Sequence, residues 1–178
     1  MWQPAMTASS QRLRRIERAR LERGFTLIEI MISIAILTIL VMVAVPSMTD
    51  LIRDQRVKNA TFDVYASLTF ARSEAIKRGA AVDIVPTLAA DWGSGWQVQV
   101  QLNNAPLKNQ DAINGINILG PVGTISYQRD GRITPAAPTF VLKSSQSDAI
   151  TARCVRVDLS GRPNIKVDTN HDPNDGCQ

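Results

Sequence analysis

The sequence is poor in the residue types that carry most enzyme chemistry. Its single histidine, His171, lies in a polar C-terminal stretch. No other histidine could therefore act as the general base of a Ser-His-Asp or Cys-His site. Its two cysteines, Cys154 and Cys177, supply neither the four ligands nor the short spacings of a structural zinc site. The sequence therefore predicts that the protein is not an enzyme and holds no cofactor.

Calcium ligands are also incomplete, although part of their pattern is present. Acidic and amide residues alternate near the C-terminus as they do in calcium loops: Asp168, Asn170, Asp172, Asn174 and Asp175. Pro173 stands where such a loop requires glycine, and no bidentate glutamate follows. A solvated tail without metal is therefore the expectation.

Net charge is also small outside the N-terminal 24 residues. The formal charge is +4, which invites a nucleic-acid partner. The first 24 residues carry six arginines and two glutamates, and the remaining 154 residues carry 14 basic and 14 acidic side chains. The basicity therefore belongs to the leader and is no sign of DNA binding.

The longest segment that is nearly free of charged residues is an apolar run over residues 25–45. These 21 residues contain one charge, Glu29, and a helix needs about 20 apolar residues to cross a bilayer. No A-x-A site follows the run, so it lacks the ending of a cleaved secretory signal. The arginines before it predict a cytoplasmic N-terminus, an inner-membrane span and a periplasmic remainder.

The junction between leader and run reads Gly24-Phe25-Thr26-Leu27-Ile28-Glu29. This stretch resembles the class III leader of type IV prepilins and pseudopilins. The resemblance implies that a prepilin peptidase cuts between Gly24 and Phe25 and N-methylates Phe25. It also implies that the apolar helix stays on the mature protein and bends at Pro46.

Glu29 has a physical interpretation of its own. A carboxylate within a membrane helix costs at least ~2.5–3.5 kcal/mol on insertion scales, so such an acid is a functional hypothesis by default. After cleavage, the α-amine of Phe25 is the natural opposite charge. The resemblance implies that Glu29 pairs with this amine on a neighbouring subunit during assembly; the alternative is an acid tolerated near the membrane interface.

Beyond Pro46 the helical pattern continues to a C-cap at Gly79. Its predicted apolar stripe comprises Leu51, Val57, Val64, Leu68, Ala71 and Ala75, broadened by Phe62, Tyr65 and Ile76. Strands are expected over 80–85, 96–102, 115–119, 124–129, 139–143, 150–159 and 165–167, with a polar loop over 103–114. Asp130-Gly131 predicts a hairpin with a two-residue loop. Trp96 is expected in the core, and Val155, Val157 and Leu159 are expected to face inward.

These patterns predict an α+β fold, with a long N-terminal helix packed on an antiparallel β-sandwich-like head. The expected parts are a removed leader (1–24), a transmembrane and assembly helix (25–45), an amphipathic periplasmic half-helix (46–79) and the head (80–178). In an oxidising periplasm, Cys154 and Cys177 most simply form a disulfide that ties the tail to a strand.

Later segments extend the resemblance: 71–79, Gly95-Trp96, 125–131 and 160–162 follow the order seen in the GspH/FimT family of minor pilins and pseudopilins. The family implies a pilin fold and a low-abundance filament subunit at or near the tip. Implied partners are the prepilin peptidase, other minor pilins, the major pilin and the inner-membrane pilus assembly platform. The terminal disulfide is similar to that of type IV pilus members.

Two other functions stay open. A type II secretion pseudopilin of GspH type would share the same leader and fold. Some related pilins bind DNA through a Gly-Arg-x-Arg stretch, but Gly161-Arg162-Pro163-Asn164 lacks the second arginine. The alternative then rests on a local basic patch, which comprises Arg153, Arg156, Arg162 and Lys166. A signal-anchored protein outside any filament would leave the Gly24-Phe25 junction and Glu29 unexplained.

Overall fold

The structure is a computed structural model that describes residues 24–135, 137–170, 172 and 177. Residues 1–23 of the predicted leader (1–24) lie outside the described residues, as does His171. Contacts divide the chain into two units, one up to Val41 and one from Met42 onward. The elements are α1 (Leu27–Arg78), β1 (Val82–Leu88), β2 (Asp91–Val100), β3 (Ala105–Gln110), β4 (Ile116–Leu119), β5 (Ile125–Tyr127), β6 (Ile133–Thr134), β7 (Thr139–Ser144), β8 (Arg153–Val157) and β9 (Pro163–Val167).

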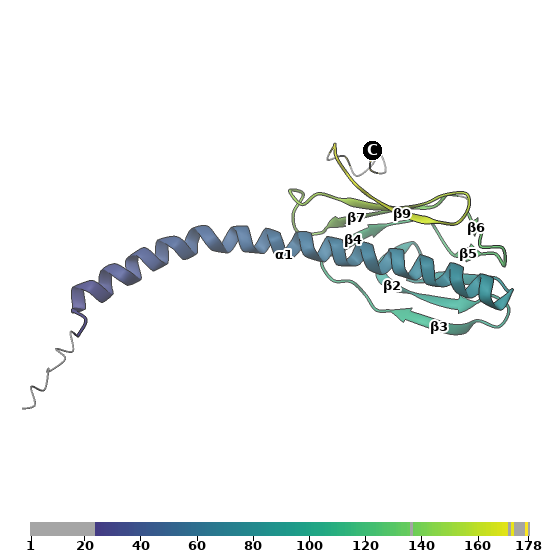
Figure 1. The fold of residues 1–178 in the computed structure, drawn as a ribbon, viewed down its shortest axis with the longest axis horizontal. Helices are drawn as coiled ribbons and strands as arrows, with labels where there is room; N and C mark the ends of the chain where they lie inside the picture. Colours follow the sequence, from purple (N-terminus) through teal and green to yellow (C-terminus); the bar gives the residue numbers. More distant parts are fainter. Residues whose placement is uncertain (1–23, 136, 171, 173–176, 178) are drawn as a thin grey trace, which may run out of the picture. The chain divides into compact units, whose positions relative to one another are not determined.

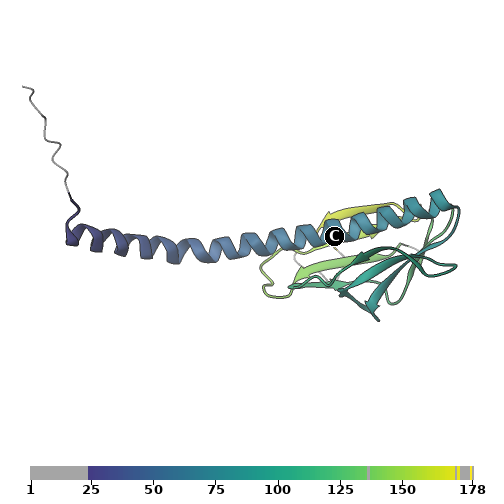
Figure 2. The same ribbon diagram turned by 90° about the horizontal axis from the view of Figure 1, so that it is seen from below.

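From Met42 onward, α1 buries one face against the sheets (Figures 1 and 2). Its buried positions recur at steps of three or four: Val57, Ala60, Thr61, Val64, Ser67, Leu68, Ala71 and Ala75. The helix ends at Arg78, and Gly79 follows with a φ of 61°, the conformation of a C-cap glycine. The apolar side chains of this face belong to the same core as side chains from both sheets.

Three residues of the predicted stripe are exposed instead: Leu51, Phe62 and Ile76. Phe62 and Ile76 each follow a buried residue by one position, and a rotation of about 100° per residue turns them outward. Leu51 precedes Val57, the first fully buried apolar residue of the helix, by more than a turn. The sequence period was right, but the width of the buried face was overestimated.

The strands form two antiparallel sheets. One has the order β3-β2-β1-β5-β6 and the other the order β4-β7-β8-β9. Their inner faces and α1 enclose one core, whose largest fully buried side chains include Trp92, Tyr127 and Phe140. Trp96 is 2% exposed, so its predicted place in the core is confirmed.

Two predictions for the head are wrong. The segment expected to be a polar loop contains β3, which pairs with β2 at the sheet edge; its polar sequence suits a strand that is nowhere fully buried. Leu159, expected to face inward, is 74% exposed because β8 ends at Val157 and Leu159 lies in the following turn. The β5–β6 hairpin forms as predicted, with three residues rather than two between Gln128 and Arg132.

The predicted disulfide is present. Cys154 on β8 is bonded to Cys177, with a Cα–Cα distance of 6.0 Å, and both residues are fully buried. They form a small cluster with Val141, which lies opposite Cys154 on β7. The bond therefore holds the chain end against the outer face of the four-stranded sheet.

Candidate functional site

The Gly24–Phe25 junction lies just outside the helix. Residues 24–26 are non-helical, and α1 begins at Leu27. Phe25 is 78% exposed, and a Cβ placed on Gly24 would have no heavy atom within 4 Å. The peptide bond between them is thus open to a peptidase and free of helical hydrogen bonding.

Thr26 sets this boundary by capping the helix. Its Oγ1 accepts a hydrogen bond from the Glu29 N–H at 3.3 Å, and its carbonyl accepts one from the Ile30 N–H at 3.2 Å. A threonine followed three residues later by glutamate is the sequence signature of a capping box. The role of Thr26 was missed in the sequence, although this signal was available.

Glu29 occupies the first turn of α1, where the helix dipole favours a negative charge. The residue is exposed, and none of the ion pairs among the described residues involves it. Its carboxylate is therefore available to a positive group on another molecule or to a newly formed chain terminus.

No described residue covers the apolar run around Glu29. Large apolar side chains from Phe25 to Val45 are exposed, and an 18-residue window of α1 reaches a mean hydropathy of 2.8. The Ser33 and Thr38 hydroxyls donate to backbone carbonyls four residues earlier, at 2.7 and 2.8 Å. Because these polar groups are satisfied within the helix, the segment suits a lipid environment by length and composition.

α1 continues through Pro46 without interruption. Proline lacks an N–H, so the carbonyl of Met42 loses its helical donor. Thr49 donates its hydroxyl to the Val45 carbonyl at 3.0 Å. A bend at Pro46 stays a prediction.

A second cluster brings together three of the sequence segments that carried the family resemblance. Arg72 Nε on α1 donates to the Gly131 carbonyl at 3.2 Å, and the Tyr127 hydroxyl donates to the Gly161 carbonyl at 3.1 Å. A Cβ on Gly161 would fall on the Gly131 carbonyl oxygen. The two glycines have φ angles of 80° and 79°, which other residues rarely adopt. Motifs that are individually weak in sequence thus form one contact.

The two glycine turns have the same hydrogen-bond pattern. In the β5–β6 turn, Gln128 N donates to Arg132 O and Gly131 N donates to Gln128 O, both at 2.8 Å. The β8–β9 turn repeats the pattern, with Asp158 N to Arg162 O at 3.0 Å and Gly161 N to Asp158 O at 2.9 Å. The cluster joins one turn from each sheet to α1, so its role is to hold the fold.

Titration in this cluster follows from its packing. Burial raises the pKa of the Tyr127 phenol, so the hydroxyl stays a donor. Asp158 lies on the surface, where the Ser160 hydroxyl and the Arg162 backbone N–H lower the pKa of its carboxyl group. Both shifts favour the protonation states that make the observed hydrogen bonds.

The residues of the predicted basic patch do not share one surface. Side chains alternate along β8, so Arg156 lies on the outer face with Cys154, while Arg153 lies on the opposite face, 3.9 Å from the Asp54 carboxylate. Lys166 on β9 lies opposite Cys154 in the β8–β9 register, so its side chain lies on the same outer face as that of Arg156. Arg162 is exposed in the β8–β9 turn. The structure brings together Arg156 and Lys166, which line one groove of about 410 Å³.

Comparison with known proteins gives two family matches. Residues 60–161, more than half of the chain, match the family described as type II transport protein GspH. Residues 19–45 match the prokaryotic N-terminal methylation motif. The second match covers the leader end, the Gly24–Phe25 junction and the apolar run.

Solved structures with a similar fold include two of the type IV minor pilin FimU from Pseudomonas aeruginosa. They are 21% and 22% identical, cover 70% and 68% of this chain and 96% and 99% of their own, and give TM-scores of 0.58 and 0.55. A structure of the minor pseudopilin EpsH from the type 2 secretion system of Vibrio cholerae is 13% identical. It covers 63% of this chain and 95% of its own, and its TM-score is 0.49. The FimU likeness shows a shared fold.

Proposed function

The chain belongs to the GspH family, and from this premise we propose that it is a minor pilin, a structural subunit of a type IV pilus. The family makes it a minor pilin or pseudopilin processed at its N-methylation motif, with a structural and non-enzymatic role. In our proposal, residues 25–45 hold the processed chain in the inner membrane with the head in the periplasm. The subunit then helps to initiate or cap the filament.

The observation that supports this most directly is the combination of an open junction and an uncovered helix. The Gly24–Phe25 bond precedes the capped start of α1, and the apolar surface that follows is exposed and uncovered by any residue that the structure describes. Cleavage would place a positive α-amine on Phe25, four residues before the unpaired carboxylate of Glu29. A neighbouring subunit would supply both the apolar cover and the opposite charge.

The C-terminal disulfide supports a type IV pilus over type II secretion, because the sequence resemblance implies such a bond in type IV pilus members of the family. The bond closes the chain end onto β8 and so gives a fixed outer face to the four-stranded sheet. Loss of the gene should then impair pilus-dependent motility or transformation and leave protein export intact. Impaired export with normal pili would assign the chain to type II secretion.

The first test is the N-terminal chemistry of the membrane-extracted protein, measured by intact mass in hosts with and without prepilin peptidase. We expect a chain starting at N-methylated Phe25 only where the peptidase is present. The variant Gly24→Leu should stay uncut in both hosts, while Gly123→Leu, at an open position in the head, should be cut normally. An uncut wild-type chain in both hosts would refute the proposal.

Assembly is tested separately with Glu29→Gln. We expect this variant to be inserted and cleaved as wild type but to be lost from the sheared filament fraction, because a neutral amide cannot form an ion pair with a protonated α-amine. Ser33→Ala, one helical turn further on, serves as the matched control and should enter filaments. Normal incorporation of Glu29→Gln would remove the assembly role of this residue.

A second candidate function, DNA binding for uptake, is supported by the shared outer face of Arg156 and Lys166. Asn164, which stands where the family stretch has its second arginine, lies opposite Arg156 in the β8–β9 register. Arg156 thus offers a cation next to the position where one is missing.

The double variant Arg156→Gln and Lys166→Gln should lower DNA retention and reduce its salt dependence by about two phosphate contacts. Arg153→Gln, whose side chain lies on the opposite face, is the control. Equal retention by wild type and the double variant would exclude this function for the groove.

A further inference from the structure

One buried carboxylate of the head lacks a partner for one of its oxygens. Asp168 follows β9 and is 1% exposed. Its backbone N–H donates to the Ala152 carbonyl at 3.0 Å, and its Oδ1 accepts the Asn170 N–H at 3.3 Å. Its Oδ2 is buried and meets no donor. Such an arrangement is unfavourable unless another group completes it, because buried polar atoms are almost always hydrogen-bonded.

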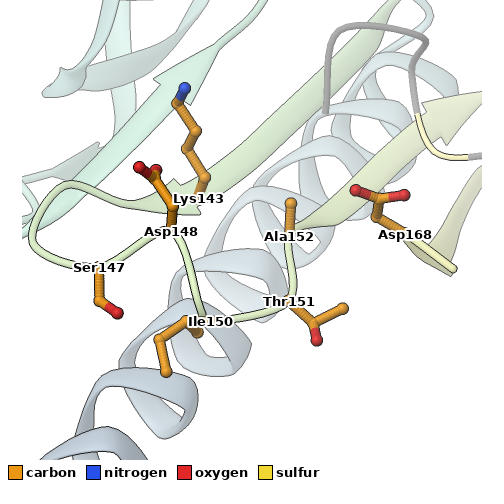
Figure 3. A pocket seen from close by; sticks show the side chains of 7 residues that line it. All are labelled: Lys143, Ser147, Asp148, Ile150, Thr151, Ala152 and Asp168. Carbon is orange, nitrogen blue, oxygen red and sulfur yellow. The ribbon is translucent and has the colours of Figure 1, made fainter. Parts of the chain in front are cut away.

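Asp168 lines a cavity of about 160 Å³ beside the β7–β8 connection (Figure 3). The wall is mixed in character, with hydroxyl groups on Ser147 and Thr151 and apolar side chains on Ile150 and Ala152. Since a water molecule occupies roughly 30 Å³, the space holds several waters or the end of one long side chain.

The cation that also lines this cavity, Lys143, does not neutralise Asp168. None of the ion pairs among the described residues joins Lys143 to Asp168 or to Asp148. In Figure 3 the Lys143 side chain does not extend toward Asp168, and Ala152 stands between the two. Within the part of the chain that the structure describes, no cation therefore pairs with the Asp168 carboxylate.

The lining favours an organic cation over a metal ion. Calcium takes six to eight oxygen ligands, and the described residues contain no group of three acidic, histidine or cysteine side chains placed to hold a metal. A lysine or arginine side chain brings one positive charge, several N–H donors and an apolar stem. These match the two carboxylates, Asp148 and Asp168, the two hydroxyl groups and the apolar side chains that line the cavity.

We propose that the cavity at Asp168 receives a lysine or arginine side chain from a neighbouring subunit of the filament. The inference rests on the proposed function, because only an assembled subunit acquires such a neighbour. It makes the disulfide-tied corner of the four-stranded sheet a contact surface between heads, in addition to the contacts made through the apolar helix.

The cavity can be probed on the full-length, detergent-solubilised protein with n-butylammonium and n-propylguanidinium, which mimic the two side chains. At roughly five times its dissociation constant, a matching probe should raise the melting temperature by about 2–4 °C. Asp168→Asn should abolish the rise, and the exposed Asp130→Asn should keep it. No rise with either probe, or a rise with calcium chloride alone, would overturn the proposal.

Lys143 provides a second measurement that does not depend on the probe. Lys143→Gln removes a competing cation, so we expect the probes to bind at least as tightly as they do to wild type. If Lys143→Gln lowered the melting temperature as much as Asp168→Asn, and the double variant lowered it no further, the two residues would pair within the chain. That result would overturn the proposal.

In cells, Asp168→Asn should be cleaved at Gly24 as wild type but be depleted from the filament fraction. Normal incorporation of this variant would refute the contact at Asp168 and leave the minor-pilin function standing. A wild-type chain that is neither cleaved nor found in filaments would instead refute the proposed function itself.

Discussion

The two halves of α1 differ in what covers their apolar side chains. Leu37, in the first half, is 59% exposed, whereas Leu68, in the second half, is 1% exposed and belongs to the core. The first half is apolar on all sides; the second has one narrow stripe of small and aliphatic residues. The second half therefore folds against its own chain, while the first half needs lipid or other molecules.

The largest effect should come from a cavity in the second half. Leu68→Ala should lower the free energy of unfolding by about 2–5 kcal/mol, because it removes buried apolar atoms and leaves a cavity that the surrounding residues do not fill. Leu37→Ala, the same change in the first half, should leave it unchanged. Fluorescence of the buried Trp92 and Trp96 during urea unfolding in detergent measures both. Equal losses would show that the halves do not differ as described.

Removing the disulfide should have the next largest effect. In the chain-entropy model, closing a loop over a separation of 23 residues stabilises the fold by about 3 kcal/mol. The double variant Cys154→Ala and Cys177→Ala should have a correspondingly lower urea concentration at its unfolding midpoint. Reducing agent should destabilise only the wild type. Insertion of the first half, measured by membrane fractionation, should not change.

An effect comparable to that of the disulfide is expected where the two glycine turns meet. Gly161→Ala requires a strained φ and places a Cβ on the Gly131 carbonyl, so it should lower stability by about 2–4 kcal/mol. Gly123→Ala has a similar φ of 85° but no neighbour within 4 Å, so only the backbone strain of about 1–2 kcal/mol remains. Equal losses in urea unfolding would show that the contact between the turns contributes nothing.

The smallest effect concerns acid. The pKa of Asp158 is lowered from 3.8 by the Ser160 hydroxyl and the Arg162 backbone N–H, so its contribution is fully present above pH 4 and is lost as pH falls through the lowered value. Asp158→Asn keeps an acceptor but removes the charge, and should flatten the loss of stability below about pH 4. An unchanged pH profile of the melting temperature, relative to Asp130→Asn, would contradict this.

Much of the fold was predictable because it depends on local patterns. The apolar run over residues 25–45, the C-cap at Gly79 and the Asp130-Gly131 hairpin are each encoded by residues that are close in sequence. β3 was missed because an edge strand can be polar on both faces and so shows no alternation. Leu159 was misplaced because the end of β8 is set by the turn that joins it to β9.

The sequence by itself determined the N-terminal methylation motif, the membrane-length helix, the α+β class and the pairing of its two cysteines. These features depend on the composition of the chain and on the spacing of its residues, both of which can be read from the linear sequence. Only the tertiary structure decided which residues meet: it joined Arg72, Gly131 and Gly161, separated Arg153 from Arg156, and buried Asp168 beside a cavity. Such contacts arise from the register and packing of strands far apart in the chain, because the shape of the assembled core selects them.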